Sequence, residues 1–159
     1  MLVSKHAYLI IAHNQPRLLQ LLVDALDDCR NDIYIHFDKK SDINTAPKTQ
    51  KAGLFIVNDR ISVYWGDYSQ VQTELILFET AYSNQSDYLN YSYYHLLSGV
   101  DYPLKSQDYI HEFCKTVGEK EFIGFYQGDD SNLRRKVGLY HLFPTHFSKE
   151  RRITFMSLL

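Results

Sequence analysis

The stretch YLNYSYYHLLSGVDYPLK at Tyr88–Lys105 constrains the fold of this chain more than any other. Its first half is almost continuous in aromatic and aliphatic residues, which is typical of a strand buried on both faces of a parallel sheet. The apolar run stops at Ser98, and Pro103 lacks the backbone donor that a sheet ladder requires. The stretch therefore predicts a central strand that leaves Asp101 at its C-terminal edge.

The sequence allows two interpretations of Asp101. Ligands of open α/β sheets bind outside the carboxyl ends of the strands, so a lone acid at that edge is well placed to meet a substrate. Alternatively, the carboxylate only shapes the turn before Pro103. The spacing alone does not separate these alternatives.

The N-terminal part of the chain predicts a β-α-β unit. Lys5–Ala12 is an apolar strand, Asn14 is a candidate N-cap, and Leu18–Leu26 carries an apolar stripe at helical spacing. A second short strand, Ile33–Phe37, ends at Asp38. Because such units are right-handed, the ends of the two strands should be neighbours on one rim.

The remaining elements continue the alternation of strands and helices. They are strands at 54–57 and 61–65, a helix from Ser69 to about Ser83 with Ser69 as a possible cap, a short helix capped by Ser106, and a strand at Glu121–Tyr126. With 159 residues, 45% of them hydrophobic, the chain has the size and the core of one domain. We expect a single α/β domain over residues 1–159, with an open, twisted, mostly parallel sheet and helices on both faces.

Composition excludes several classes of function. The formal charge of −2 argues against nucleic acid as a partner, because nucleic-acid-binding domains usually carry a basic excess. No apolar segment approaches the ~20 residues that span a bilayer, and no cleavable signal is visible. We therefore expect a cytoplasmic protein. Peripheral association with the inner face of the membrane stays an alternative. Cys29 and Cys114 are far apart, which predicts reduced thiols and neither a disulfide nor a cysteine-based zinc site.

His13, His36 and Asp38 offer a metal site as a competing hypothesis, since imidazole and carboxylate together suit several divalent ions. Side-chain alternation weakens it. His36 and Asp38 share a face only if the strand continues through Asp38, and a buried, hydrogen-bonded role suits His13 equally well. We therefore expect no metal.

Four blocks in order carry a resemblance to a known family. They are AYLIIAH at Ala7–His13, YIHFDKKSD at Tyr34–Asp42, VYWGDYSQVQ at Val63–Gln72 and LLSGVDYPLKS at Leu96–Ser106. Together they resemble the Core-2/I-branching β-1,6-N-acetylglucosaminyltransferase family, which includes the peptide xylosyltransferases; the likeness thins after Lys105. The resemblance implies a GT-A-like fold, a UDP-sugar donor and a glycan acceptor. It also implies metal independence, because Gly99-Val100-Asp101 stands where an Asp-x-Asp motif would bind metal.

The resemblance also implies a set of donor-binding residues, namely Ala12, His13, Asp38, Tyr64, Trp65 and Asp101. Ala12 would approach the uracil or ribose through its backbone, and Asp38 would accept hydrogen bonds from the nucleoside. Trp65, or Tyr64 one residue earlier, would cover the nucleotide. Asp101 would lie close to the donor sugar.

The family's inverting displacement uses a glutamate base, with cations that neutralise the departing diphosphate in a later part of the fold. No motif between Gly128 and Leu159 matches that base, so no catalytic residue is assigned. Arg134 and Arg135 are candidate phosphate or acceptor contacts, or else a solvated face. We expect the donor-binding part of a longer transferase, truncated at the C-terminus, whose apolar end ITFMSLL favours self-association.

Two functions of different classes follow. One is an enzyme, or its donor-binding fragment, that transfers N-acetylglucosamine or another hexose or pentose from a UDP-sugar to a glycan. The other is a non-catalytic module that binds a nucleotide or glycan or serves in assembly. Turnover of a UDP-sugar separates them.

Overall fold

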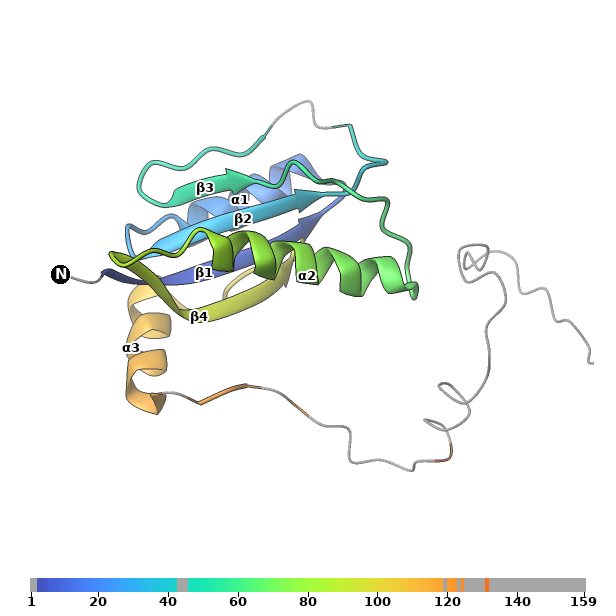
Figure 1. The fold of residues 1–159 in the computed structure, drawn as a ribbon. Helices are drawn as coiled ribbons and strands as arrows, with labels where there is room; N and C mark the ends of the chain where they lie inside the picture. Colours follow the sequence, from blue (N-terminus) through green and yellow to red (C-terminus); the bar gives the residue numbers. More distant parts are fainter. Residues whose placement is uncertain (1–2, 43–45, 119, 123, 125–130, 132–159) are drawn as a thin grey trace, which may run out of the picture.

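The computed structural model describes residues 3–42, 46–118, 120–122, 124 and 131. Within them, a four-stranded sheet has the order β3-β2-β1-β4 and is parallel throughout (Figure 1). Its strands are β1 (Val3–Ala12), β2 (Asn31–Phe37), β3 (Gly53–Ile56) and β4 (Leu89–Ser98). The predicted α/β class is confirmed, consistent with a GT-A-like domain.

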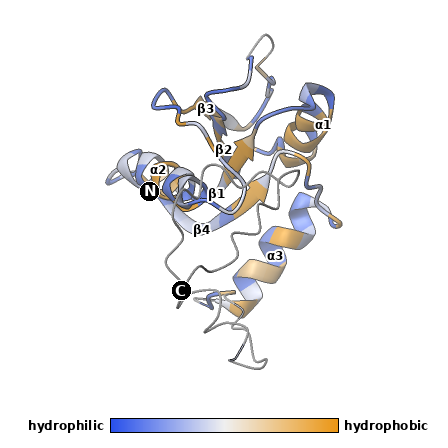
Figure 2. Cartoon of the chain, turned by 90° about the vertical axis from the view of Figure 1, so that its right-hand side faces the viewer, coloured by the Kyte–Doolittle hydropathy of each residue, from blue (hydrophilic) through white to orange (hydrophobic). Residues whose placement is uncertain are grey.

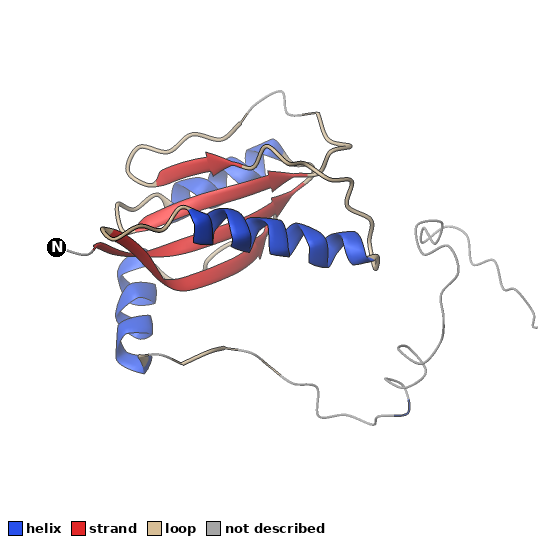
Figure 3. Cartoon of the chain, in the orientation of Figure 1, coloured by secondary structure: helices blue, strands red, loops and turns tan. Residues whose placement is uncertain are grey.

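In the described part of the chain, three helices cover the two faces of the sheet. They are α1 (Pro16–Leu26), α2 (Tyr68–Ser83) and α3 (Gln107–Val117). Figures 2 and 3 show α2 on one face, with α1 and α3 on the other. Successive side chains of β1 point to opposite faces of the sheet, as in any strand. Tyr8 and Ile10 pack with α1, and Ala7 and Leu9 pack with α2. Among the described residues, no helix is both long and apolar enough to cross a membrane.

The centre of the sheet is formed by β1 and β2. Every residue of β2 is buried, as expected of a strand that is paired on both edges and covered on both faces. Each fully buried Leu or Ile stabilises such a core by about 1.5–3 kcal/mol. The β-α-β prediction is confirmed, since β1 and β2 pair in parallel up to Ala12 and Phe37.

The prediction that the aromatic stretch forms a central strand is wrong. β4 lies at an edge of the described sheet, and most of its side chains are half-buried, with Leu96 40% exposed. The stretch is apolar on both faces because α2 lies against one face and α3 against the other. A strand can be covered by helices on both faces without being paired with another strand on both edges.

A β-bulge in β4 helps to place aromatic side chains on both faces of the strand. The register with β1 shifts after Lys5, so that Lys5 pairs with Tyr91 whereas His6 pairs with Tyr93. The extra residue, Ser92, reverses the alternation of side chains. Tyr91 consequently packs in the cluster beneath α2, and Tyr93 lies on the α3 face, where its hydroxyl donates to the Cys114 carbonyl.

The helix caps differ in part from the prediction. Gln15 occupies the N-cap of α1 in a left-handed conformation with φ 60°, in place of the predicted Asn14. Asp67 caps α2 by accepting from the Ser69 N–H, so Ser69 is not the cap. Ser106 caps α3 as predicted.

One predicted strand is not found, and another lies partly outside the described residues. Residues 61–65 form an irregular segment that follows β3, as described below. In the predicted strand at 121–126, the described residues Glu121, Phe122 and Gly124 are not in a strand, and the others lie outside the described part of the chain.

Candidate functional site

The carboxyl ends of β1, β2 and β4 form one rim. The Asp38 N–H donates to the Ala12 carbonyl at 2.8 Å, and the Gly99 N–H donates to the Ile11 carbonyl at 2.9 Å. A Cβ added to Gly99 would lie only 3.1 Å from the Ala12 Cβ, which is closer than ordinary side-chain contacts. Ala12, Asp38 and Gly99 are therefore neighbours, and for Ala12 and Asp38 the β-α-β unit predicted this.

Asp38 is a buried acid with some hydrogen-bonding capacity left. Its side chain is 8% exposed, and Oδ1 accepts from the Lys40 N–H at 2.9 Å and from the Val63 N–H at 3.4 Å. The Lys40 ammonium lies 3.4 Å from Oδ2, which is too long for a strong hydrogen bond. Asp38 is therefore not a solvated loop acid, and Oδ2 can still accept from a ligand.

Arg60 fixes the backbone that carries Asp38. Its guanidinium donates to the carbonyls of Phe37 at 3.1 Å, Asp38 at 2.7 Å and Ser41 at 2.7 Å. One planar, always charged group thus closes the turn after β2. Arg60 was not predicted from the sequence, where the only hint was a basic residue directly before the ISVYWGD segment.

His36 holds the irregular segment against the end of β2. The ring is fully buried, and Nε2 accepts from the Ile61 N–H at 3.1 Å, so Nε2 carries no proton. Burial lowers the pKa of His36 below its usual value, which keeps the ring neutral. The groups of described residues close enough to share an ion do not include His36, His13 or Asp38.

The bond between His36 and Ile61 predicts a dependence of stability on pH. As the pH falls below about 6.5, His36 takes up a proton in the unfolded chain before it does so in the folded chain. The contribution of neutral His36 to stability is therefore present above pH 6.5 and is lost as the pH falls. Glutamine can accept the same bond without titrating. In urea unfolding, the free energy of unfolding of the wild type should therefore fall more between pH 7.5 and pH 5 than that of His36→Gln. Equal losses in the two proteins would contradict the prediction.

Tyr64 and Trp65 differ sharply in environment. The Lys40 ammonium lies 3.9 Å from the centroid of the Tyr64 ring, a cation–π distance, and the Tyr64 N–H donates to Ser69 Oγ. Trp65 is 78% exposed and precedes Gly66, whose φ of 74° turns the chain into α2. Trp65 therefore offers the larger accessible aromatic face, while Tyr64 is engaged with Lys40.

Asp101 shapes the turn that follows β4. Its Oδ2 accepts from the Ser98 N–H at 2.7 Å, and the Asp101 N–H donates to the Ser98 carbonyl at 3.0 Å. The turn-shaping interpretation is thus supported. It does not exclude ligand binding, because an exposed carboxylate has a second oxygen and further lone pairs.

The structure brings together most of the predicted site. Ala12 and Asp38 are in contact, and Asp101 follows Gly99 on the same rim. His13 is exposed there, and its carbonyl accepts from Ser41 Oγ at 2.6 Å. Arg134 and Arg135, like the apolar C-terminal end, lie outside the described residues.

Lys40 is the second functional candidate that the sequence analysis missed. Its ammonium donates to the Val63 carbonyl at 2.6 Å, besides its contacts with Asp38 and Tyr64. It joins the turn after β2 to the irregular segment and places a positive charge at the rim. The signal was the Lys39-Lys40 pair directly after Asp38.

Comparison with known proteins gives consistent matches. The model of the family described as "Branch: Core-2/I-Branching enzyme" matches residues 6–154. The chain is similar to a xylosyltransferase of Ciona intestinalis, with 23% identity over 141 residues, and to xylosyltransferase 1 of Homo sapiens, with 24% identity over 147 residues. Each alignment covers 86% of this chain but only 16% and 15% of those relatives, so the chain spans about a sixth of their length.

Proposed function

The chain belongs to the Core-2/I-branching enzyme family, and from this premise we propose that its strand rim binds the UDP-sugar donor of a glycosyltransferase. The observation that carries the proposal is Asp38, a buried carboxylate at the carboxyl end of a central strand with Oδ2 still able to accept. A desolvated carboxylate held in place beforehand is a strong acceptor for ribose hydroxyls or a uracil N–H.

The other rim residues take complementary parts in this proposal. Ala12 is buried, because Gly99 packs closely against its small side chain, and in this proposal a nucleoside meets the backbone at this edge of the rim. Trp65 supplies a flat face for the base or the sugar. Asp101 stands beyond β4, where it would meet hydroxyls of the donor sugar.

The proposed reaction is an inverting, metal-independent transfer to a glycan hydroxyl. The hydroxyl attacks the anomeric carbon, the bond to the diphosphate breaks, and UDP leaves with the bonding electrons. Stabilisation of the leaving diphosphate is the main electrostatic demand. Lys40, held at the rim, is the described cation best placed to contribute, and no residue is assigned as the base that takes the hydroxyl proton.

Metal independence gives a direct test. Titration calorimetry of the full chain with UDP, after EDTA treatment, is expected to show binding that added magnesium or manganese does not strengthen, because Asp101 stands alone where a metal-binding pair would be. CDP is the matched control, since it has the same diphosphate and a different base. Binding that requires magnesium or manganese would contradict the proposal for this rim.

The second candidate is a non-catalytic module that keeps nucleotide or glycan binding. It rests on the same rim, since binding a nucleotide or a glycan does not require a catalytic base. Assays for hydrolysis or transfer with UDP-N-acetylglucosamine and UDP-xylose separate the two. Turnover supports the transferase, whereas UDP binding without turnover supports the module.

A further inference from the structure

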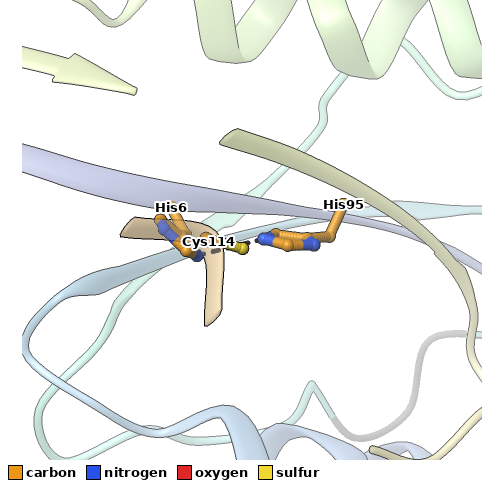
Figure 4. Close-up of side chains that lie close together, drawn as sticks. All are labelled: His6, His95 and Cys114. Atoms are coloured by element: carbon orange, nitrogen blue, oxygen red, sulfur yellow. Dashed lines mark hydrogen bonds between the residues drawn. The ribbon is translucent and has the colours of Figure 1, made fainter. Parts of the chain in front are cut away.

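Three potential metal ligands meet on the α3 face of the sheet. They are His6 of β1, His95 of β4 and Cys114 of α3, and their ligand atoms all lie within 4.8 Å of one another (Figure 4). His95 Nε2 is 3.0 Å from His6 Nδ1, and the Cys114 sulfur lies beside both rings. His6 and Cys114 are each only 4% exposed.

The fold places these ligands through the β-bulge described above. Because the register shifts at Ser92, His6 pairs with Tyr93 and Tyr8 pairs with His95, so that His6 and His95 lie on the same face of adjacent strands. Gln107 anchors the start of α3 by accepting from the Tyr8 hydroxyl at 3.1 Å and from Asn31 Nδ2 at 2.8 Å. That anchor brings Cys114, two turns further along the helix, over the histidine pair.

This cluster is distinct from the strand rim. α3 packs where β2 begins, through hydrogen bonds of its His111 to Asn31 and of Arg30 to its Asp108. In Figure 1 the arrowheads of the strands point to the opposite end of the sheet. The cluster therefore belongs to neither the proposed donor site nor its turns.

We propose that His6, His95 and Cys114 bind one transition-metal ion, and that this ion is Zn²⁺. Two imidazoles and one thiolate form a donor set that zinc prefers. In a tetrahedral zinc site with Zn–N bonds of 2.0–2.1 Å, two ligand nitrogens are about 3.3 Å apart, a few tenths of an ångström more than the 3.0 Å observed. The two imidazoles need only a small adjustment to admit the ion, and the Cys114 sulfur lies within 4.8 Å of both ligand nitrogens.

The protonation states of the two rings agree with this role. Burial, followed by the neighbouring His111, lowers the pKa of His6 to about 3 and that of His95 to about 4. Both rings are therefore neutral at pH 7, and neutral imidazole is the form that binds metal. Burial raises the pKa of the Cys114 thiol, so metal binding must remove that proton.

The binding step balances as follows. Zn²⁺ replaces the proton on Cys114 Sγ, which is released to solvent, so one proton leaves per ion. The proton shared between His6 Nδ1 and His95 Nε2 moves to the other nitrogen of its own ring, because both shared nitrogens become ligands. An adjoining cavity of about 930 Å³, lined in part by His6, Tyr93 and Cys114, leaves room for water as the fourth ligand.

Sequence patterns could not reveal this site. The distance between Cys29 and Cys114 in the sequence predicts no cysteine-based zinc site, because the usual spacing of paired ligands is missing. Here the three ligands come from three different elements that the sheet order and α3 bring together. The proposal is independent of the donor site, so the failure of one does not affect the other.

The full chain titrated with Co²⁺, a spectroscopic substitute for zinc, tests the proposal. The wild type should bind one equivalent and show visible bands of tetrahedral cobalt with a thiolate-to-cobalt charge-transfer band, and Zn²⁺ should displace it. Cys29→Ser, which removes the exposed thiol, is the matched control and should keep both features. Cys114→Ser should lose the charge-transfer band.

His95→Gln provides a second variant that does not depend on the buried thiol. It should weaken Zn²⁺ binding by at least about 100-fold, because even changes to outer-shell partners usually cost 10- to 100-fold. Circular dichroism like that of the wild type shows that the variant is folded. The proposal is overturned if the wild type shows no thiolate band, if the band disappears in Cys29→Ser, or if folded His95→Gln binds Zn²⁺ as tightly as the wild type.

Discussion

Asp38→Asn is expected to weaken UDP binding by about 1.5–3 kcal/mol, or roughly 10- to 150-fold, the range for hydrogen bonds to charged groups. The reason is the loss of charge at Oδ2, the oxygen that lies 3.4 Å from Lys40 and that we expect to face the nucleoside. Calorimetry of the variant checks this value. Asp42→Asn, which neutralises an exposed acid four residues later, is the control and should bind UDP as the wild type does.

The stability of the same variant must be measured separately, because Asp38 is buried. A solvated acid would leave stability unchanged within about 0.5 kcal/mol. In the structure the introduced asparagine side chain would keep an oxygen for the N–H groups of Lys40 and Val63 and lose only the ion pair, which costs up to about 1 kcal/mol. Unchanged UDP affinity in the folded variant would remove Asp38 from the site.

Asp32→Ala is expected to lower the free energy of unfolding by about 3–5 kcal/mol, the usual cost of removing one partner of a buried ion pair. Asp32 is 2% exposed, its Oδ1 accepts from the Lys5 ammonium at 2.8 Å, and its Oδ2 accepts from the Tyr91 hydroxyl at 2.8 Å. The network continues from Tyr91 to the Tyr34 hydroxyl at 2.7 Å. The substitution would remove the acceptor of the Lys5 ammonium and of the buried Tyr91 hydroxyl.

Urea unfolding measures this loss, with Asp59→Ala, an exposed acid, as the control that should change stability by no more than about 0.5 kcal/mol. Tyr91→Phe removes a single hydroxyl and should cost less than Asp32→Ala, about 1–3 kcal/mol. A loss below about 1 kcal/mol for Asp32→Ala would show that the network contributes little to stability.

The local elements of this fold could be predicted from the sequence because each depends on nearby residues. The position of Asp38 beside Ala12 was predicted without any knowledge of the other strands. It follows from the apolar strand up to Ala12, the apolar stripe of α1 and the turn after β2. The burial of Asp38 could not be predicted in the same way. It depends on residues 61–63, which fold over the end of β2 because Arg60 and His36 bind backbone groups across the turn.

The position of β4 and the histidine cluster were hidden for a different reason. Hydrophobic periodicity indicates whether the two faces of a strand are covered. The order of strands in a sheet depends instead on hydrogen bonding at the strand edges. A one-residue bulge at Ser92 also leaves no trace in composition. His6, His95 and Cys114 meet only after both features are known.

The central position of β1 has a consequence for synthesis on the ribosome. One edge of β1 gains its partner, β2, soon after α1, but on the other edge Ile11 must wait for Ser98. At 5–20 residues per second, that interval is roughly 4–17 s. Throughout it, the nascent chain presents an apolar strand with unpaired backbone groups, the kind of edge that invites aggregation. A chaperone that shields that edge should therefore help this chain most before β4 emerges.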